Sequence, residues 1–208
     1  MTLSAARTRS LLKAMRGRRV LVLGDVMLDQ FLWGRVARLS PEAPVPVVEI
    51  ASETFHLGGA ANVAANVRAL GGEAVVAGLV GDDDPGARVR AALAEAGIED
   101  ALSVAEGRPT TVKTRIIAHH QQVVRADREM SDAVAGALER ALLERVRAAL
   151  PSCLALILSD YHKGVITAAV VRSVVALARR RGVPVLVDPK VAHFGFYRRV
   201  SLVTPNQL

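Results

Sequence analysis

The sequence predicts an α/β fold built on a parallel, Rossmann-like sheet with helices on both faces. Apolar runs of strand length alternate along the chain with segments of helical character. Such alternation indicates crossover connections, and crossovers place helices on both faces of a parallel sheet. Hydrophobic residues make up 51% of the 208 residues, so a full core is available and disorder is excluded.

Five apolar runs have the length of buried strands. The first is interrupted by Asp25, and none approaches the ~18–20 residues that cross a membrane. The expected strands are 20–28, 74–80, 154–158, 183–187 and 202–204.

Capping residues mark the expected helices. Asp84, Ser131 and Thr167 are residues that commonly precede or open a helix, and Pro85 suits a first helical position. Glycine follows three of the segments, at 71–72, 97 and 182, and Pro151 ends a fourth. The expected helices are 4–15, 60–70, 84–97, 131–151 and 167–181.

Two segments, 31–57 and 110–126, break the alternation and read as extended chain. Within the second, 111–117 and 121–125 suggest paired strands with a turn near His119 and His120. We expect both segments to form a small β-sheet over the carboxyl ends of the main strands. Ligands bind at those ends in open α/β sheets, so this small sheet is a candidate lid.

Charge and cysteine content restrict the function. The net charge of +7 comes mostly from scattered arginines, whereas a nucleic-acid binder more often shows a concentrated basic stripe with aromatics. A phosphorylated substrate also fits this excess. Cys153 is the single cysteine, so the chain cannot form an internal disulfide bond, and no signal peptide is apparent. We expect a cytoplasmic protein with neither nucleic acid nor membrane as partner.

The segment after the first strand carries hydroxyl-binding residue types. Asp25 and Asp29 can accept hydrogen bonds from sugar hydroxyls, and for Asp25 a turn-capping role is equally open. Gly58 and Gly59 open a helix that carries Asn62, and the free N–H groups of such a helix start suit anions and hydroxyls. A plain flexible turn is the alternative. No G-x-G-x-x-G follows the first strand and no P-loop is present.

Further polar residues follow two later strands. Asp160 and Lys163 come after 154–158, and Asp188 and Lys190 end the next strand. A site is expected at such strand ends, although Asp160 could instead cap a helix. Lysine is rare in this arginine-rich chain, so each lysine is of interest as a compact ammonium group. The histidines show no metal-ligand spacing.

At this point the chain resembles a known family. Gly58-Gly59-x-x-Asn62 with Gly78-Leu79-Val80-Gly81-Asp82-Asp83 is similar to the ribokinase-like (PfkB) carbohydrate kinases. Four further motifs resemble those of the heptose-7-phosphate kinase group. They are Gly24-Asp25-Val26-Met27-Leu28-Asp29, Ser40-Pro41-Glu42-Ala43-Pro44-Val45-Pro46-Val47-Val48, Leu158-Ser159-Asp160-Tyr161-x-Lys163-Gly164 and Val187-Asp188-Pro189-Lys190. The resemblance covers about 20–206.

The resemblance implies a kinase that phosphorylates C1 of D-glycero-β-D-manno-heptose 7-phosphate for lipopolysaccharide core (ADP-heptose) synthesis, with ATP and Mg²⁺ as cofactors. It also implies a homodimer through the β lid. The implied sugar-phosphate-binding residues are Asp29, Gly58, Gly59, Asn62, Lys113, Arg115, Gln122, Arg125 and Asp160. Those implied for the nucleotide are Lys163, Asp188, Lys190 and Asn206, and no residue binds the metal directly. For each lid residue, a solvated strand face is the alternative.

The chain departs from the family in two motifs. Thr204-Pro205-Asn206 matches the start of an Asn-x-x-Glu element, but the sequence stops at Leu208 before the Glu. The Gly-Ala-Gly-Asp element, which supplies the family's catalytic base, is absent from the 208 residues. We therefore expect an incomplete kinase domain over 1–208, without the C-terminal part of the fold, without a catalytic residue and inactive by itself. The alternatives are a non-catalytic sugar-phosphate-binding remnant or subunit, and another PfkB-family sugar kinase.

Overall fold

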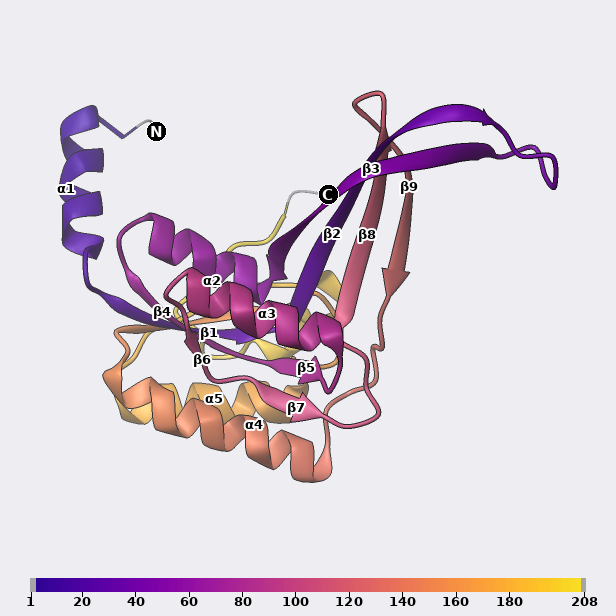
Figure 1. The fold of residues 1–208 in the computed structure, drawn as a ribbon. Coiled ribbons are helices and arrows are strands. Elements are labelled where there is room, and N and C mark those ends of the chain that lie inside the picture. The colour runs from indigo at the N-terminus through magenta and orange to yellow at the C-terminus, as the bar shows by residue number, and fades with distance from the viewer. Residues whose placement is uncertain (1–2, 207–208) are drawn as a thin grey trace.

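The computed structural model describes residues 3–206. Its central sheet has six parallel strands in the order β12-β11-β10-β1-β4-β6 (Figure 1). The strands are β1 (Arg19–Gly24), β4 (Glu73–Ala77), β6 (Glu99–Asp100), β10 (Ala155–Ser159), β11 (Val185–Asp188) and β12 (Leu202–Val203). The predicted parallel sheet is confirmed, and β1 lies inside it between β10 and β4.

Helices cover both faces of this sheet, as predicted. One layer holds α2 (Ala60–Ala69) and α3 (Asp84–Glu95), and the other holds α4 (Gly136–Ala149) and α5 (Ala168–Arg180) (Figure 1). Successive side chains of a strand point to opposite faces, so β1 serves two cores. Leu21 and Leu23 pack in the α4–α5 core, and Val22 packs in the α2–α3 core, all three with 0% exposure.

A second sheet of four strands rises from the carboxyl edge of the first (Figure 1). Its order is β3-β2-β8-β9, with only β2 and β8 parallel. The strands are β2 (Val26–Leu39), β3 (Pro46–Gly59), β8 (Thr111–Ala118) and β9 (Gln121–Arg128). They extend beyond the predicted lid segments 31–57 and 110–126. Beyond Gly34, β2 pairs with β3 alone, so these two strands continue as a long arm.

Several predicted boundaries were wrong. The apolar run 20–28 is two strands, because the chain leaves the main sheet at Asp25 and enters the second sheet. The run 74–80 breaks at Gly78, where a side chain would lie 2.6 Å from the carbonyl oxygen of Gly24. Helix α4 begins at Gly136 rather than near Ser131. Asp83, not Asp84, caps α3, by accepting a bond from the Gly86 amide.

Other local predictions were confirmed. Thr167 caps α5 through its side chain, and His119 and His120 form the β8–β9 turn with φ of 50° and 63°. The remaining elements are α1 (Ala5–Met15), β5 (Leu79–Gly81), β7 (Ser103–Ala105), η1 (Leu150–Ser152) and η2 (Val191–Phe196). Strands β6 and β7 and the η2 segment have no counterpart among the predicted elements.

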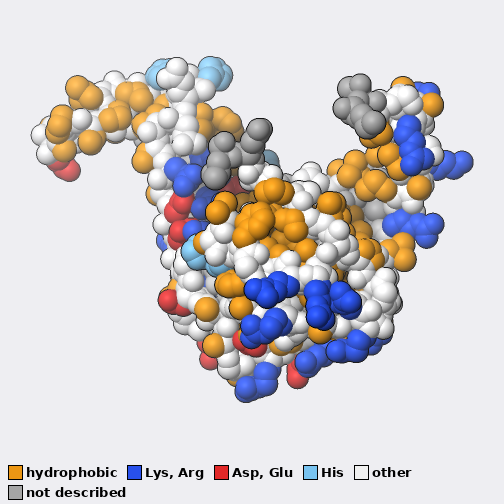
Figure 2. Space-filling model, turned by 180° about the vertical axis from the view of Figure 1, so that it is seen from behind, with side chains coloured by type: hydrophobic (Ala, Val, Ile, Leu, Met, Phe, Trp, Pro, Cys, Tyr) orange, Lys and Arg blue, Asp and Glu red, His pale blue; other side chains and the backbone are white. Residues whose placement is uncertain are grey.

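A basic, partly apolar surface covers the outer side of α5 and the η2 segment. Figure 2 shows an apolar area bordered by arginines on this side of the molecule. Val171, Val175 and Phe196 line a hollow of about 830 Å³ here. The arginines around it are Arg172, Arg179, Arg180, Arg198 and Arg199.

Leucines at the two ends of one strand test the position of the core. Leu158 in β10 is 0% exposed, whereas Leu154, just before this strand, is 54% exposed. We expect Leu158→Ala to lower the free energy of unfolding by about 3 kcal/mol because it leaves a cavity. The matched Leu154→Ala should change it by less than about 0.5 kcal/mol. Urea unfolding measures both, and equal losses would contradict this core.

Candidate active site

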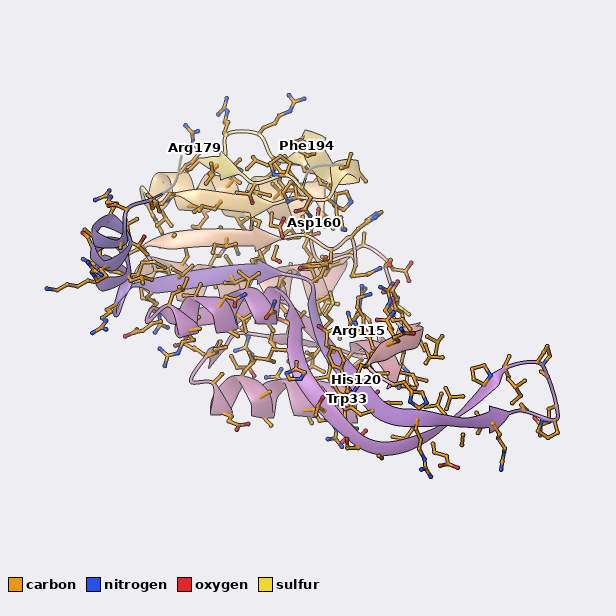
Figure 3. The ribbon with its side chains drawn as sticks, turned by 90° about the horizontal axis from the view of Figure 1, so that it is seen from above. Trp33, Arg115, His120, Asp160, Arg179 and Phe194 are labelled. Atoms are coloured by element: carbon orange, nitrogen blue, oxygen red, sulfur yellow. The ribbon has the colours of Figure 1, made fainter. Side chains whose placement is uncertain are left out.

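The candidate site lies where the lid sheet meets the carboxyl ends of β1, β10 and β11. Figure 3 shows Asp160 at the end of its sheet strand and Arg115 on the lid, with Trp33 and His120 farther out along the lid. The loop after β10 and the start of α2 complete the surroundings. Ligand sites of open parallel sheets form at this edge.

Neighbouring atoms come so close to the main chain at Gly58 and Gly59 that both positions require glycine. Gly59 has φ of 55°, and a side chain there would lie 2.2 Å from the Asp25 carbonyl oxygen. A side chain at Gly58 would lie 2.7 Å from Oδ2 of Asp29. The structure thus brings Asp29 and Gly58 together across β2 and β3. Asn62 lies in the first turn of α2 with its side chain exposed.

One face of the lid gathers the predicted basic residues. Lys113 and Arg115 alternate along β8 and therefore share a face, and Arg125 pairs with Arg115 across the strands. Arg115 donates to Oδ1 of Asp29 at 2.6 Å and lies over the Phe31 ring at 5.2 Å. We call this side of the lid the site face. Gln122, exposed on β9, lies at the far end of the same strand pair.

Carboxylates of the lid that sequence reasoning missed neutralise these cations. The Lys113 ammonium lies 2.9 Å from Asp127 and 3.4 Å from Glu129. Glu129 also accepts a bond of 2.7 Å from Lys163, so the site face points toward the loop after β10. The hydrogen bond from Lys113 lowers the pKa of Asp127, and that from Lys163 lowers the pKa of Glu129. The alternation of Arg125, Asp127 and Glu129 was the available signal.

Asp25 has a structural position. Its side chain is 1% exposed and accepts three main-chain bonds from the loop after β10. The amides of Tyr161, Lys163 and Val165 donate at 2.8, 3.1 and 3.1 Å. Burial raises the pKa of Asp25, and these bonds act in the opposite direction. Of its two possible roles, the geometry favours the fixing of a turn.

Asp160 is likewise surrounded by donors. Its carboxylate accepts from the His162 amide at 2.8 Å, from Nδ1 of His193 at 2.7 Å, and from the Tyr197 hydroxyl. Burial, followed by the bond to Asp160, raises the pKa of Tyr197. With 3% exposure, Asp160 joins η2 to the end of β10. This differs from the expected open substrate ligand, and its contact with substrate stays a prediction.

The residues predicted for the nucleotide are less concentrated. Asp188 ends β11, and burial raises the pKa of its carboxyl while nearby Lys190 lowers it. The Lys190 ammonium lies 5.8 Å from the centre of the Tyr161 ring. Asn206 is exposed after β12. The two positions that follow Asn206 in the Asn-x-x-Glu element, Gln207 and Leu208, lie outside the described residues.

The opposite face of the lid serves a different purpose. Leu28, Gln30 and Thr114 alternate with the site-face residues and point toward α3. With Arg88 of that helix they line a hollow of about 370 Å³. The Arg88 guanidinium lies over the Phe55 ring at 4.6 Å. The lid is therefore supported from behind by α3.

Comparison with known proteins identifies the family. The family described as pfkB family carbohydrate kinase matches residues 18–207. The chain belongs to this family. A solved structure with the same fold is the tetrameric inhibited form of phosphofructokinase-2 from Escherichia coli, with a TM-score of 0.68 and 19% identity over 92% of this chain and 62% of that one.

Curated relatives of this pfkB-family chain are more similar in sequence. It is 50% identical to the Bifunctional protein HldE of Caulobacter vibrioides over 94% of its own length and 40% of that protein. It is 44% identical to the protein of the same name from Bradyrhizobium diazoefficiens, over 95% and 41%. The chain thus spans about two fifths of the length of these relatives.

The described part of this pfkB-family chain has neither a metal-binding cluster nor a membrane-spanning helix. Residues 3–206 contain no group of three or more His, Cys, Asp or Glu side chains arranged to hold a metal ion. No helix within the same residues has the length and hydrophobicity needed to span a bilayer.

The Glu129 contacts predict a pH-dependent stability. The unfolded chain has the ordinary glutamate pKa of 4.5, and the folded chain has a lower one. As the pH falls, the unfolded state takes up the proton first, so the stabilisation is present above about pH 4.5 and is lost as the pH falls through the lowered pKa. Glu129→Gln should therefore lower stability at neutral pH, and its effect should be smaller at about pH 3, below the ordinary glutamate pKa.

Urea unfolding of the native chain and the variant at both pH values measures this difference. Glu106→Gln, on an exposed turn, is the matched control and should have little effect at either pH. A loss for Glu129→Gln that is the same at both pH values would show that its charge is not responsible.

Proposed function

We propose that this chain is the sugar-binding part of an ATP-dependent kinase that phosphorylates C1 of D-glycero-β-D-manno-heptose 7-phosphate. The observation that carries the proposal is the site face of the lid. It joins a carboxylate and a glycine edge, suited to hydroxyls, to a row of cations suited to phosphate. The match of residues 18–207 to the pfkB family carbohydrate kinases and the 44% and 50% identity to proteins named Bifunctional protein HldE support a sugar kinase.

In this proposal Asp29 and the main-chain N–H groups beside Gly58 and Gly59 bind sugar hydroxyls, and Asn62 adds an amide. Lys113 and Arg115 bind the 7-phosphate, with Arg125 and Gln122 at the outer side. Each cation already has a carboxylate partner, so a phosphate dianion must compete with Asp127, Glu129 and Asp29. This exchange favours a strongly charged substrate over a neutral sugar.

The nucleotide belongs to the other side of the site. We assign Lys163 and Lys190 to contacts with the phosphates of ATP, with Asp188 and Asn206 near them. ATP supplies the transferred phosphoryl group. Among the described residues, Asp188 is the one carboxylate assigned to this side, and no group of three or more His, Cys, Asp or Glu side chains is arranged to hold Mg²⁺. Because the 208 residues contain no Gly-Ala-Gly-Asp, ligand binding is a more direct test than turnover.

We also assign the protein to the cytoplasm and to a homodimer formed through the lid. At the lid arm, Trp33 at its base, Ile50 of β3 and Val45 of the turn before β3 have 39%, 47% and 51% of their surface accessible. An exposed strand edge with apolar side chains is a surface suited to pairing.

Substitution of the lid arginine tests the substrate. We expect Arg115→Ala to weaken binding of heptose 7-phosphate by about 10- to 100-fold, because it removes a charge-assisted hydrogen bond. Calorimetry with the purified chain measures the affinity. Arg35→Ala is the matched control, since Arg35 pairs only with Glu49 on the arm and is 74% exposed.

Calorimetry with several sugars and sugar phosphates separates the heptose kinase from another sugar kinase and from a chain that binds no sugar. The neutral heptose should bind at least about tenfold more weakly than its 7-phosphate. Tighter binding of another sugar phosphate would favour a different sugar kinase of this family. No binding of any sugar phosphate would contradict the proposed function.

A charged residue on the arm tests the homodimer. We expect Ile50→Lys to convert the dimer to a monomer, because a lysine cannot remain solvated inside an apolar contact. Light scattering after gel filtration measures the mass. Val104→Lys, at an equally exposed valine of β7, should leave the dimer intact. A native chain that is monomeric at all concentrations would refute the assignment.

A further inference from the structure

Arg108 occupies the place where the lid, the main sheet and the loop after β10 meet. Its guanidinium donates to three main-chain carbonyl oxygens and, among the described residues, to no carboxylate. The acceptors are Asp132 at 2.8 Å, Met130 at 2.9 Å and Lys163 at 2.5 Å. The first two belong to the segment by which the chain leaves the lid, and the third belongs to the candidate site.

The two segments joined by Arg108 touch through their main chains. The Val134 amide donates to the Gly164 carbonyl at 2.9 Å. Gly164 has φ of 90°, and a side chain there would lie 2.0 Å from the Asp132 carbonyl oxygen. No other residue fits at this junction, so the exit of the lid and the Lys163 loop are packed without space between them.

The start of the β8–β9 part of the lid is fixed two residues after Arg108. Thr110 precedes β8, and its amide and hydroxyl donate to the carboxylate of Asp83. Asp83 caps α3, and hydrogen bonds from Thr110 and Gly86 lower its pKa although burial acts to raise it. Pro109 stiffens the link between Arg108 and Thr110. The short run 108–110 therefore anchors both the start and the end of the β8–β9 part of the lid.

Lys163 is held from three directions. Its amide donates to Asp25 at 3.1 Å, its carbonyl accepts from Arg108, and its ammonium lies 2.7 Å from Glu129. Asp25 and Arg108 fix the main chain, and Glu129 fixes the side chain. Of the two contacts that fix the main chain, the one made by Arg108 also binds the exit of the lid. Arg108 therefore links the exit to the main chain of Lys163, whereas Glu129 links it to the side chain.

We propose that Arg108 is a positioning residue that holds Lys163 in the site and makes the Lys163 loop and the base of the lid one unit. The proposal rests on the proposed function only in the assignment of Lys163 to a phosphate of ATP. The two terminal nitrogens of its planar guanidinium bind these carbonyls from separate, fixed positions, whereas a lysine ammonium donates from a single nitrogen. Because its partners are carbonyl dipoles, Arg108 also keeps its full positive charge beside the site.

Hydrogen exchange of the 208-residue chain tests the proposal independently of catalysis. In Arg108→Lys, which keeps the charge, the amides of Lys163 and Val165 should exchange at least about tenfold faster because the loop opens locally. Amides of the sheet strands should be unchanged. Arg140→Lys, at an exposed arginine of α4, is the matched control and should change none of them.

Two results would overturn the proposal. One is unchanged exchange of the Lys163 and Val165 amides, and the other is a uniform increase over the whole chain, which indicates a general loss of stability. Arg108→Ala, compared at the same temperature below its own unfolding transition, should give a larger local increase than Arg108→Lys. Equal increases would show that the retained charge contributes nothing and that the fork of donors alone holds the loop.

A double-mutant cycle with ATP connects this result to binding. If Arg108 acts through Lys163, the loss of ATP affinity in Arg108→Lys should largely vanish in a Lys163→Ala background. Fully additive losses would contradict the positioning role. If the unsubstituted chain does not bind ATP, the nucleotide assignment of Lys163 fails, and the exchange result alone decides the role of Arg108.

Discussion

The structure depends on the buried carboxylate of Asp25 and the main-chain groups around it. The side chain binds three amides of the loop after β10, the Asp25 amide donates to Ser159, and its carbonyl accepts from Ala60 at the start of α2. One residue thus fixes the end of β1, the start of the lid, a helix N-terminus and the Lys163 loop. Burial of a carboxylate is costly unless donors surround it, and here main-chain amides are those donors. The close approach also explains why Gly59 has no side chain.

The lid sheet has two different faces, because successive side chains of each strand point to opposite sides. Odd-numbered residues of β8, such as Lys113 and Arg115, belong to the site face, and Thr114 between them points toward α3. A shift of one residue in register would exchange the two sets, so the pairing of β8 with β2 and β9 determines which charges face a ligand. The contacts of Arg108 and Asp83 at the base of the lid hold it in one orientation relative to the main sheet.

The sequence was sufficient for the layers of the fold and for the general location of the site. Alternating apolar runs predicted the sheet, and the glycine pair and strand ends predicted where polar residues gather. The structural roles of Asp25 and Asp160 could not be predicted from the sequence. Most donors to their carboxylates come from segments distant in sequence, and such donors leave no local pattern. Nor did the sequence predict the start of α4, because Ser131 has a good capping side chain but the chain between it and Gly136 is held by Arg108 and Gly164 instead. Asp127 and Glu129 were missed because they lie on and just after β9, close to Arg125 in sequence, and become partners of Lys113 only when β8 pairs with β9.

The near balance of charge on the site face affects how an anionic substrate arrives. Lys113, Arg115, Arg125 and Lys163 face the carboxylates of Asp29, Asp127 and Glu129 at short range. At a distance of more than about 10 Å, in physiological salt, such a set has little net field. The site face itself therefore contributes little to long-range steering of an anion. Discrimination for phosphate then takes place after contact, at the step in which the ion pairs exchange partners.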